Sequence, residues 1–327
     1  GLPTAEGEVY RKIDALIEEN HALISTINPD HVDNAGYANI AKVKTEAGFD
    51  LTPLIIGSQG TLGIITEAII RLDDLLPYKI SRLLSFTTLA DAMDASDQLL
   101  KLKPTILDIF SHKLFQISAD QGRIYPDAMT ADEKMGGQTA YHLLVQVEAK
   151  NKFSLKSIAK KIATIAKQAR GIANDNDEVM QMRDLPLMLD FDETIHKAVP
   201  IACGASVPRV KWQSFADTIA KLEIAMGLDL PIYGSVLTEV LNLQSSLDLH
   251  QIINKQKALK LLNSYSTLVT ELGGVICANG GDGRLKSLVA PKQISPELAQ
   301  LYAEIKAIFD PYGIFAPRVK QHADLRD

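Results

Sequence analysis

Apolar residues recur at helical spacing in several stretches of the chain. The first lies near the N-terminus, where Val9, Ile13, Leu16 and Ile17 share one face of a helix predicted over residues 6–24. The same spacing predicts further helices over residues 89–102, 152–169, 212–227, 255–272 and 296–309.

Other stretches alternate between apolar and polar residues, which is typical of β-strands. The alternation is clearest over residues 141–149, and strands are also predicted over residues 64–72, 79–86, 105–111 and 202–208, with a strand pair over 231–247. Strand, helix and strand therefore follow one another repeatedly. This order favours an α+β architecture with helices on one face of an antiparallel sheet.

Charge and composition exclude several classes of protein. The 327-residue chain is 46% hydrophobic with a formal net charge of −6, and this acidity argues against a nucleic-acid-binding surface, which is normally basic. No apolar run approaches the roughly 18 residues of a membrane-spanning helix, and residues 1–10 show no signal-peptide pattern. Cys203 and Cys277 lie far apart in sequence and suit buried thiols in a reducing compartment. We therefore expect a cytoplasmic protein without an integral membrane segment.

Three glycines stand immediately before the strand predicted over residues 64–72. Gly57, Gly60 and Gly63 occur in the stretch GSQGTLG. Glycine permits positive φ angles and lets a ligand approach the backbone closely, and free N–H groups in such a turn can face phosphate or ring oxygens. The alternative is a tight loop that only leads into a buried strand.

Three segments resemble one family of flavoproteins. They are NAGYANI…AGFDLTPLIIGSQGTLGIITEAIIRL, GGVICANGGDGRL and IKAIFDPYGIFAPRVK, in this order. They are similar to motifs of the FAD-linked oxidase family of the vanillyl-alcohol-oxidase (PCMH-type FAD) fold, in the branch of the D-lactate, glycolate and D-2-hydroxyglutarate dehydrogenases. That branch typically has a glutamate where Gln59 stands here.

The resemblance implies a domain organisation. Residues 1–76 are expected to form the end of a PCMH-type FAD-binding domain, 77–272 a ferredoxin-like cap domain for the substrate, and 273–327 a C-terminal segment that returns to the flavin domain. Nothing before residue 34 resembles the glycine-rich loop that holds the FAD pyrophosphate in this family. We therefore expect an N-terminally truncated chain, which on its own binds FAD incompletely.

The resemblance also implies which residues contact the cofactor. Ser58, Gln59, Gly60, Thr61, Gly63 and Ile64 are the expected FAD-binding residues.

The matching catalytic positions depart from the family pattern. Metal-containing members have two histidine ligands, a glutamate ligand and a histidine base, whereas the positions here carry Ser235, Asn242, Asn279 and Gly280. Serine and asparagine are poor ligands for a transition metal, so no bound metal is expected.

The catalytic residues therefore remain unknown, with Arg284 and Asp282 as candidates. Arg284 could bind a substrate carboxylate, or it could be a solvated surface charge. Asp282 could act as a base, or it could form an Asx turn between two glycines.

The resemblance implies an FAD-dependent dehydrogenase that oxidises a small 2-hydroxy acid by hydride transfer to flavin, with an altered site and an unknown electron acceptor. The alternative is a catalytically silent family member that serves as a binding or complex-forming module. A homodimer, a partner subunit and peripheral association with a membrane all stay open.

Overall fold

The computed structural model describes residues 4–27, 34–174, 176, 178–190, 199–245 and 247–320. They form two compact units. Unit 1 is drawn from residues 1–70, 204–206 and 262–327, and unit 2 from residues 71–203 and 207–261. The predicted domains 1–76, 77–272 and 273–327 stay a prediction.

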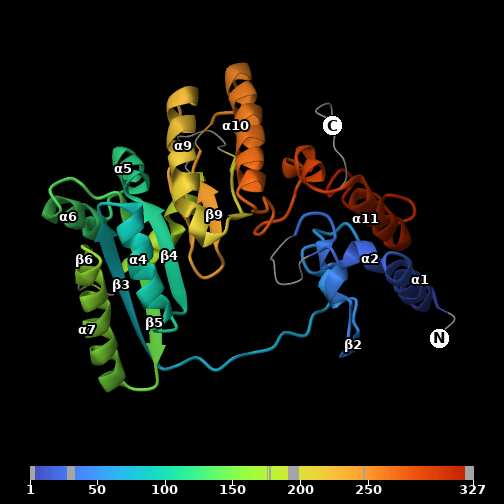
Figure 1. Cartoon of the computed structure of the whole chain (residues 1–327), viewed down its shortest axis with the longest axis horizontal. Coiled ribbons are helices and arrows are strands. Elements are labelled where there is room, and N and C mark those ends of the chain that lie inside the picture. The colour runs from blue at the N-terminus through green and yellow to red at the C-terminus, as the bar shows by residue number, and fades with distance from the viewer. Residues whose placement is uncertain are drawn as a thin grey trace. The chain divides into compact units, whose positions relative to one another are not determined.

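Eleven α-helices are assigned within the described residues (Figure 1), and their bounds are α1 Ala5–Glu19, α2 His21–Ile24, α3 Thr52–Ile55, α4 Leu89–Leu100, α5 His112–Asp120, α6 Pro126–Lys134, α7 Lys152–Gln168, α8 Leu185–Asp190, α9 Trp212–Met226, α10 Ile252–Glu271 and α11 Pro296–Phe309. The strands are β1 Lys44–Thr45, β2 Gly48–Phe49, β3 Tyr78–Phe86, β4 Ile106–Ser111, β5 Tyr141–Ala149, β6 Ile172–Ala173, β7 Ala205–Ser206, β8 Ile232–Ser235 and β9 Val240–Leu243.

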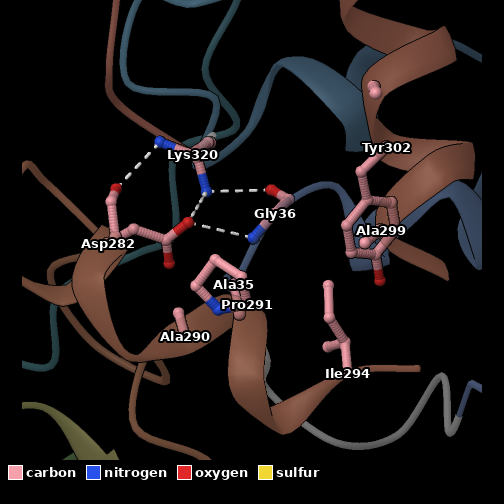
Figure 2. A pocket seen from close by; sticks show the side chains of 11 residues that line it. Ala35, Gly36, Asp282, Ala290, Pro291, Ile294, Ala299, Tyr302 and Lys320 are labelled. Carbon is pink, nitrogen blue, oxygen red and sulfur yellow. Dashed lines mark hydrogen bonds and ion pairs between the residues drawn. The ribbon is translucent and has the colours of Figure 1, made fainter. Parts of the chain in front are cut away.

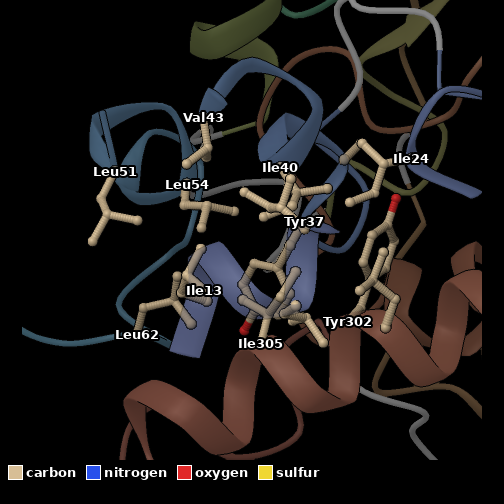
Figure 3. Close-up of a cluster of buried hydrophobic side chains, with 14 residues drawn as sticks. Ile13, Ile24, Tyr37, Ile40, Val43, Leu51, Leu54, Leu62, Tyr302 and Ile305 are labelled. Atoms are coloured by element: carbon tan, nitrogen blue, oxygen red, sulfur yellow. The ribbon is translucent and has the colours of Figure 1, made fainter. Parts of the chain in front are cut away.

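The core of unit 1 joins the two ends of the described chain. Ile13 of α1 packs with Ile40 of a 3-10 helix, with Leu54 of α3, with Leu62 and with Ile305 of α11 (Figure 3). The first turn of α11 has Pro296, and the Ser295 side chain accepts a hydrogen bond from the amide of Leu298, which fixes the start of this helix. This packing brings α11 against the loop that follows α3.

Unit 2 is built around an antiparallel sheet. Its strands run in the order β6-β3-β5-β4-β8-β9, and β3 pairs with β5 along the whole of both strands. Leu83, Phe110 and Leu144 pack from one face with side chains of α5, α6 and α8. The other face carries Leu84 and Leu143, which are also buried, and α4 and α7 lie against β3 and β5. The α+β class is confirmed, while α5, α6 and α8 add a second helical layer that the sequence did not predict.

The strand predicted over residues 64–72 is wrong. Residues 64–76 have no strand assignment, and Ile64 and Ile69 are 80% and 102% exposed. A β-strand needs a neighbour for its backbone hydrogen bonds, and no described strand pairs with this segment. The strand predicted over 202–208 is likewise reduced to the two residues of β7.

Among the described residues, no helix combines the length and the apolar character needed to cross a lipid bilayer.

Candidate functional site

The glycine loop of unit 1 is a tightly hydrogen-bonded turn. Gly57 and Gly60 have φ angles of 75° and 72°, which residues with a Cβ atom rarely adopt. Thr61 is fully buried, and its Oγ1 donates to the carbonyl of Ser58 at 2.7 Å. The hydroxyl oxygen of Tyr37 lies 2.7 Å from Oγ1 of Thr61. Two of the three polar side chains of the loop, Ser58 and Thr61, are therefore buried in its interior.

A lysine of α11 is hydrogen-bonded to the glycine loop. The Nζ of Lys306 donates to the carbonyl of Thr61 at 2.6 Å and to that of Phe315 at 2.8 Å, and it lies 2.5 Å from the carboxylate of Asp310. Burial alone would raise the pKa of Asp310, but hydrogen bonds from Lys306 and from the amides of Ile314 and Phe315 hold that pKa at about 2. The Asp310 carboxylate thus stays charged, and its contact with Lys306 fixes the loop to the helix.

Gln59 joins the glycine loop to the second motif loop, residues 279–284. Its Nε2 donates to the carbonyl of Gly280 at 3.3 Å, while its Oε1 accepts from the amides of Asp282 and Gly283 at 3.1 and 3.2 Å. A Cβ on Gly281 would stand 2.7 Å from the Gln59 side chain. The glutamine that replaces the usual family glutamate therefore serves as an amide bridge, because it can donate and accept at once.

Asp282 is buried and already engaged. Its carboxylate accepts from the amide of Gly36 at 3.0 Å and pairs with Lys320 at 3.6 Å (Figure 2). The Nζ of Lys320 also donates to the carbonyl of Gly36 at 2.9 Å. These groups form the polar side of a cavity of about 380 Å³, whose other side is apolar and includes Ile294 and Tyr302. The contacts favour a structural role for Asp282, and its role as a base stays a prediction.

The remaining predicted site residues of unit 1 differ in accessibility. Gly60 is exposed, and a Cβ built on Gly60 or Gly63 would meet nothing within 4 Å. The amides of both glycines donate no hydrogen bond to another described residue. Ile64 and Arg284 are exposed. The open side of the loop thus consists of backbone, as close approach to a ligand requires.

The positions that match the family's histidine ligands lie on β8 and β9 of unit 2. Ser235 is paired across the sheet with Asp108 of β4, and Asn242 is paired with Tyr233. Directly paired residues share a face, so these side chains lie on one face of the sheet. Ser235 forms a side-chain hydrogen bond with Asp108.

Asp108 and Arg183 form a charged pair that the sequence analysis missed. The Nε of Arg183 donates to Oδ2 of Asp108 at 2.6 Å. The Asp108 side chain is 10% exposed and that of Arg183 is 46% exposed. Burial raises the pKa of Asp108 and outweighs the opposing effect of Arg183 and Ser235. A lone aspartate within the apolar strand TILDIFS was the available signal, because a buried charge needs a partner.

No group of three or more His, Cys, Asp or Glu side chains suited to a metal ion occurs within the described ranges. The expected absence of a metal stays a prediction.

The residues of the glycine loop fit the flavin cofactor that the resemblance implies. A flavin needs a wall that it can approach closely and N–H donors for its ring oxygens. Gly60 and Gly63 offer open space and backbone amides, and Gln59 and Lys306 hold the loop in place.

Comparison with known proteins identifies the family of this chain. Residues 77–319 match the family model described as FAD linked oxidases, C-terminal domain. The D-lactate dehydrogenase of Archaeoglobus fulgidus is 25% identical over 280 residues, which cover 84% of this chain and 59% of that protein. The glycolate oxidase subunit GlcD of Bacillus subtilis is 25% identical over 287 residues, with coverage of 84% and 57%. The chain thus spans less than two thirds of the length of these relatives.

A solved structure shares the fold. The 4-ethylphenol oxidase from Gulosibacter chungangensis superimposes with a TM-score of 0.61 at 13% identity, covering 89% of this chain and 62% of that one. Because the family model spans most of the sequence, the assignment does not depend on any single relative. The chain belongs to the FAD-linked oxidases and contains their C-terminal domain.

Proposed function

We propose that this chain supplies one wall of the flavin site and the substrate cap of an FAD-dependent oxidoreductase that oxidises a small 2-hydroxy acid. The relatives named D-lactate dehydrogenase and glycolate oxidase subunit support this substrate class.

The observation that carries the proposal is the construction of the glycine loop. The buried side chain of Thr61 bonds within the protein, whereas the backbone at Gly60 and Gly63 is open. Stability alone does not require an open backbone surface that is fixed by Lys306 on one side and by Gln59 on the other. A flavin laid against this surface accounts for both features.

Unit 2, which we propose as the substrate cap, contributes side chains that suit a 2-hydroxy acid. When bound, FAD supplies the acceptor for the hydride from the acid's Cα. Arg183 bonds Asp108 through Nε, and nearly half of its side chain is exposed, so its other N–H groups can bind the acid's carboxylate. Asp108, whose pKa is raised by burial and whose carboxylate is hydrogen-bonded to Ser235, would take the hydroxyl proton at a carboxylate oxygen.

A catalytically silent role is the second candidate. Ser235, Asn242, Asn279 and Gly280 replace the family's ligands and base, while the cofactor loop is retained. This pattern would also result if the chain kept the flavin wall for binding or assembly. Loss of the reaction with retention of FAD would support it.

FAD binding at the glycine loop tests the proposal directly. A titration followed by flavin fluorescence is expected to saturate, and Gly60→Val should weaken binding at least about tenfold because a branched side chain fills the approach. The matched control is Gly122→Val in unit 2, since Gly122 also has positive φ and open space around it. Equal binding by the two variants would overturn the assignment of the loop.

A further inference from the structure

We propose that the outer face of α7 docks on an anionic lipid surface, with the ring of Phe153 entering the interface. This inference does not depend on the flavin site, and it concerns a part of unit 2 that the proposed function leaves unused.

The charge around α7 is one-sided. Between Ala149 and Gly171 the sequence contains six lysines and one arginine but no aspartate or glutamate, whereas the whole chain has a net charge of −6. A block of one sign in a chain of the opposite sign creates a local positive potential that attracts anions.

The packing of α7 directs these lysines outward. Ile162 and Ala166 are buried, and the helix contacts β3, β5, β6 and α4 (Figure 1). The six lysines are all exposed, and they are Lys150, Lys152, Lys156, Lys160, Lys161 and Lys167. Since the apolar side of the helix is occupied by the sheet, α7 cannot turn over, and only its basic face is available to a partner.

Two acidic residues of the neighbouring helix α4 are bound by arginines, and one of these arginines, Arg170, belongs to the basic block itself. Asp91 is bound by Arg170, and Asp97 by Arg209. Asp94 is exposed on the same helix. None of the six lysines forms an ion pair with a described residue. Lys152 lies over the ring of Tyr78, at 5.9 Å from its centre. The charges of the six lysines are therefore not neutralised by ion pairs among the described residues of the unit.

An exposed aromatic ring favours a lipid surface over an acidic protein. Phe153, in the first turn of α7, is 86% exposed, and Leu75, three residues before Tyr78 at the start of β3, is 88% exposed. Lysines attract anionic head groups, while a protruding apolar side chain gains from leaving water at the head-group boundary. The combination is typical of proteins that lie on a membrane surface.

Sedimentation with vesicles tests the proposal with the full chain and without flavin. We expect binding to phosphatidylcholine vesicles that contain phosphatidylserine, release by high salt, and no binding to phosphatidylcholine alone. Reversing two charges in Lys156→Glu/Lys160→Glu should weaken binding at least about twentyfold, since each lysine contributes roughly fivefold. The matched control, Lys255→Glu/Lys260→Glu on α10, makes the same charge change at two exposed lysines and should bind as before.

A fluorescent variant tests the insertion of residue 153. The chain has one tryptophan, Trp212, which is buried and should not respond to vesicles. In Phe153→Trp, the added emission should shift to the blue with anionic vesicles. Lack of vesicle binding, equal loss in both lysine pairs, or binding of polyglutamate without binding of vesicles would each overturn the proposal. Because no step involves FAD, these results are independent of the proposed oxidoreductase activity.

Discussion

Lys306 reaches 245 residues back along the chain and donates a hydrogen bond of 2.6 Å to the carbonyl of Thr61 in the glycine loop. The two residues are buried, and the same ammonium group pairs with Asp310. One cation therefore couples the last helix of unit 1 to the loop that we assign to the cofactor. The geometry of the loop depends on the C-terminal segment as much as on its own glycines.

Replacing this lysine should change the acid sensitivity of the fold. The pKa of Asp310 is lowered from its ordinary 3.8 to about 2, so its contribution to stability is present above about pH 4 and is lost as the pH falls toward 2. Lys306→Met removes the principal partner, and the free energy of unfolding should fall near neutral pH and depend less on pH in this range. Urea unfolding at several pH values measures this.

Asp310→Asn is the companion variant, because it removes the same titration while keeping the donor to Thr61. A Lys306→Met protein with unchanged stability and unchanged acid sensitivity would contradict the role of the pair.

Two glycines of unit 1 should differ in their tolerance of alanine. A Cβ on Gly36 would stand 2.2 Å from the ring of Tyr302, while one on Gly60 would meet nothing within 4 Å. Both have positive φ. We expect Gly36→Ala to lower the free energy of unfolding by roughly 2–5 kcal/mol and Gly60→Ala by only about 1 kcal/mol. Chemical denaturation separates them, and similar losses would show that the space around Gly60 is wrongly described.

A buried histidine pair in unit 2 should make stability depend on pH. Nδ1 of His112 lies 2.8 Å from Nε2 of His142, whose Nδ1 lies 2.8 Å from Oγ of Ser85, and Nε2 of His112 lies 3.5 Å from Asp132. Burial lowers the pKa of both histidines. The pKa of His142 is lowered to about 3. The neutral forms of the two histidines suit the folded state, so this stability is present above about pH 6.5 and is lost as the pH falls, by about 1.4 kcal/mol per pH unit for His142.

His112→Asn removes one of the two titrating groups. The slope of unfolding free energy against pH between about pH 6 and pH 5 should become shallower than in the unchanged protein, because one of two groups with a lowered pKa is gone. A slope equal to that of the unchanged protein would mean that the pair does not resist protonation.

The two arginine candidates can be compared directly. If Arg183 binds the acid's carboxylate, Arg183→Met should raise the concentration of 2-hydroxy acid needed for half-maximal flavin reduction by about 10- to 100-fold, as expected for loss of a charged hydrogen bond. Arg284→Met serves as the matched control, because Arg284 is an exposed arginine of the second motif loop. The opposite ranking would assign the carboxylate to Arg284.

Metal removal should leave the protein unaffected. Ser235, Asn242, Asn279 and Gly280 supply no strong ligands at the positions of the family's metal site. Elemental analysis after dialysis should find no stoichiometric zinc, and a chelator should not change FAD binding. Stoichiometric metal that resists dialysis would contradict this expectation.

The sequence predicted what depends on local pattern. The alternation over 141–149 is β5 without a shift, and the helices predicted over 152–169, 212–227 and 296–309 are α7, α9 and α11. The helices α5, α6 and α8 have only six to nine residues each, which is too short to show a clear helical period of apolar residues. The sequence therefore did not predict them. The segment 64–72 has the composition of a strand, but a strand also needs a partner, which composition does not reveal.

The candidate site was predictable only in its motifs. The glycine loop and the ANGGDGR loop stand out in the sequence, but the side-chain bridge from Gln59 to Asp282 and Gly283 spans more than two hundred residues. Arg183 and Asp108 are likewise 75 positions apart. Such pairs are set by strand order and helix packing, which periodicity does not encode.

The central claim is that a 2-hydroxy acid reduces a flavin held at the glycine loop, and anaerobic reduction tests it most directly. The FAD-loaded protein is mixed without oxygen with D-lactate, glycolate or D-2-hydroxyglutarate, and the visible flavin absorbance is followed; where the chain is part of a longer polypeptide, that polypeptide is used. The assay follows the reductive half-reaction alone, so the later electron acceptor need not be known. We predict that at least one acid bleaches the flavin and that Gly60→Val does not respond. Bound flavin that no 2-hydroxy acid bleaches would contradict the account.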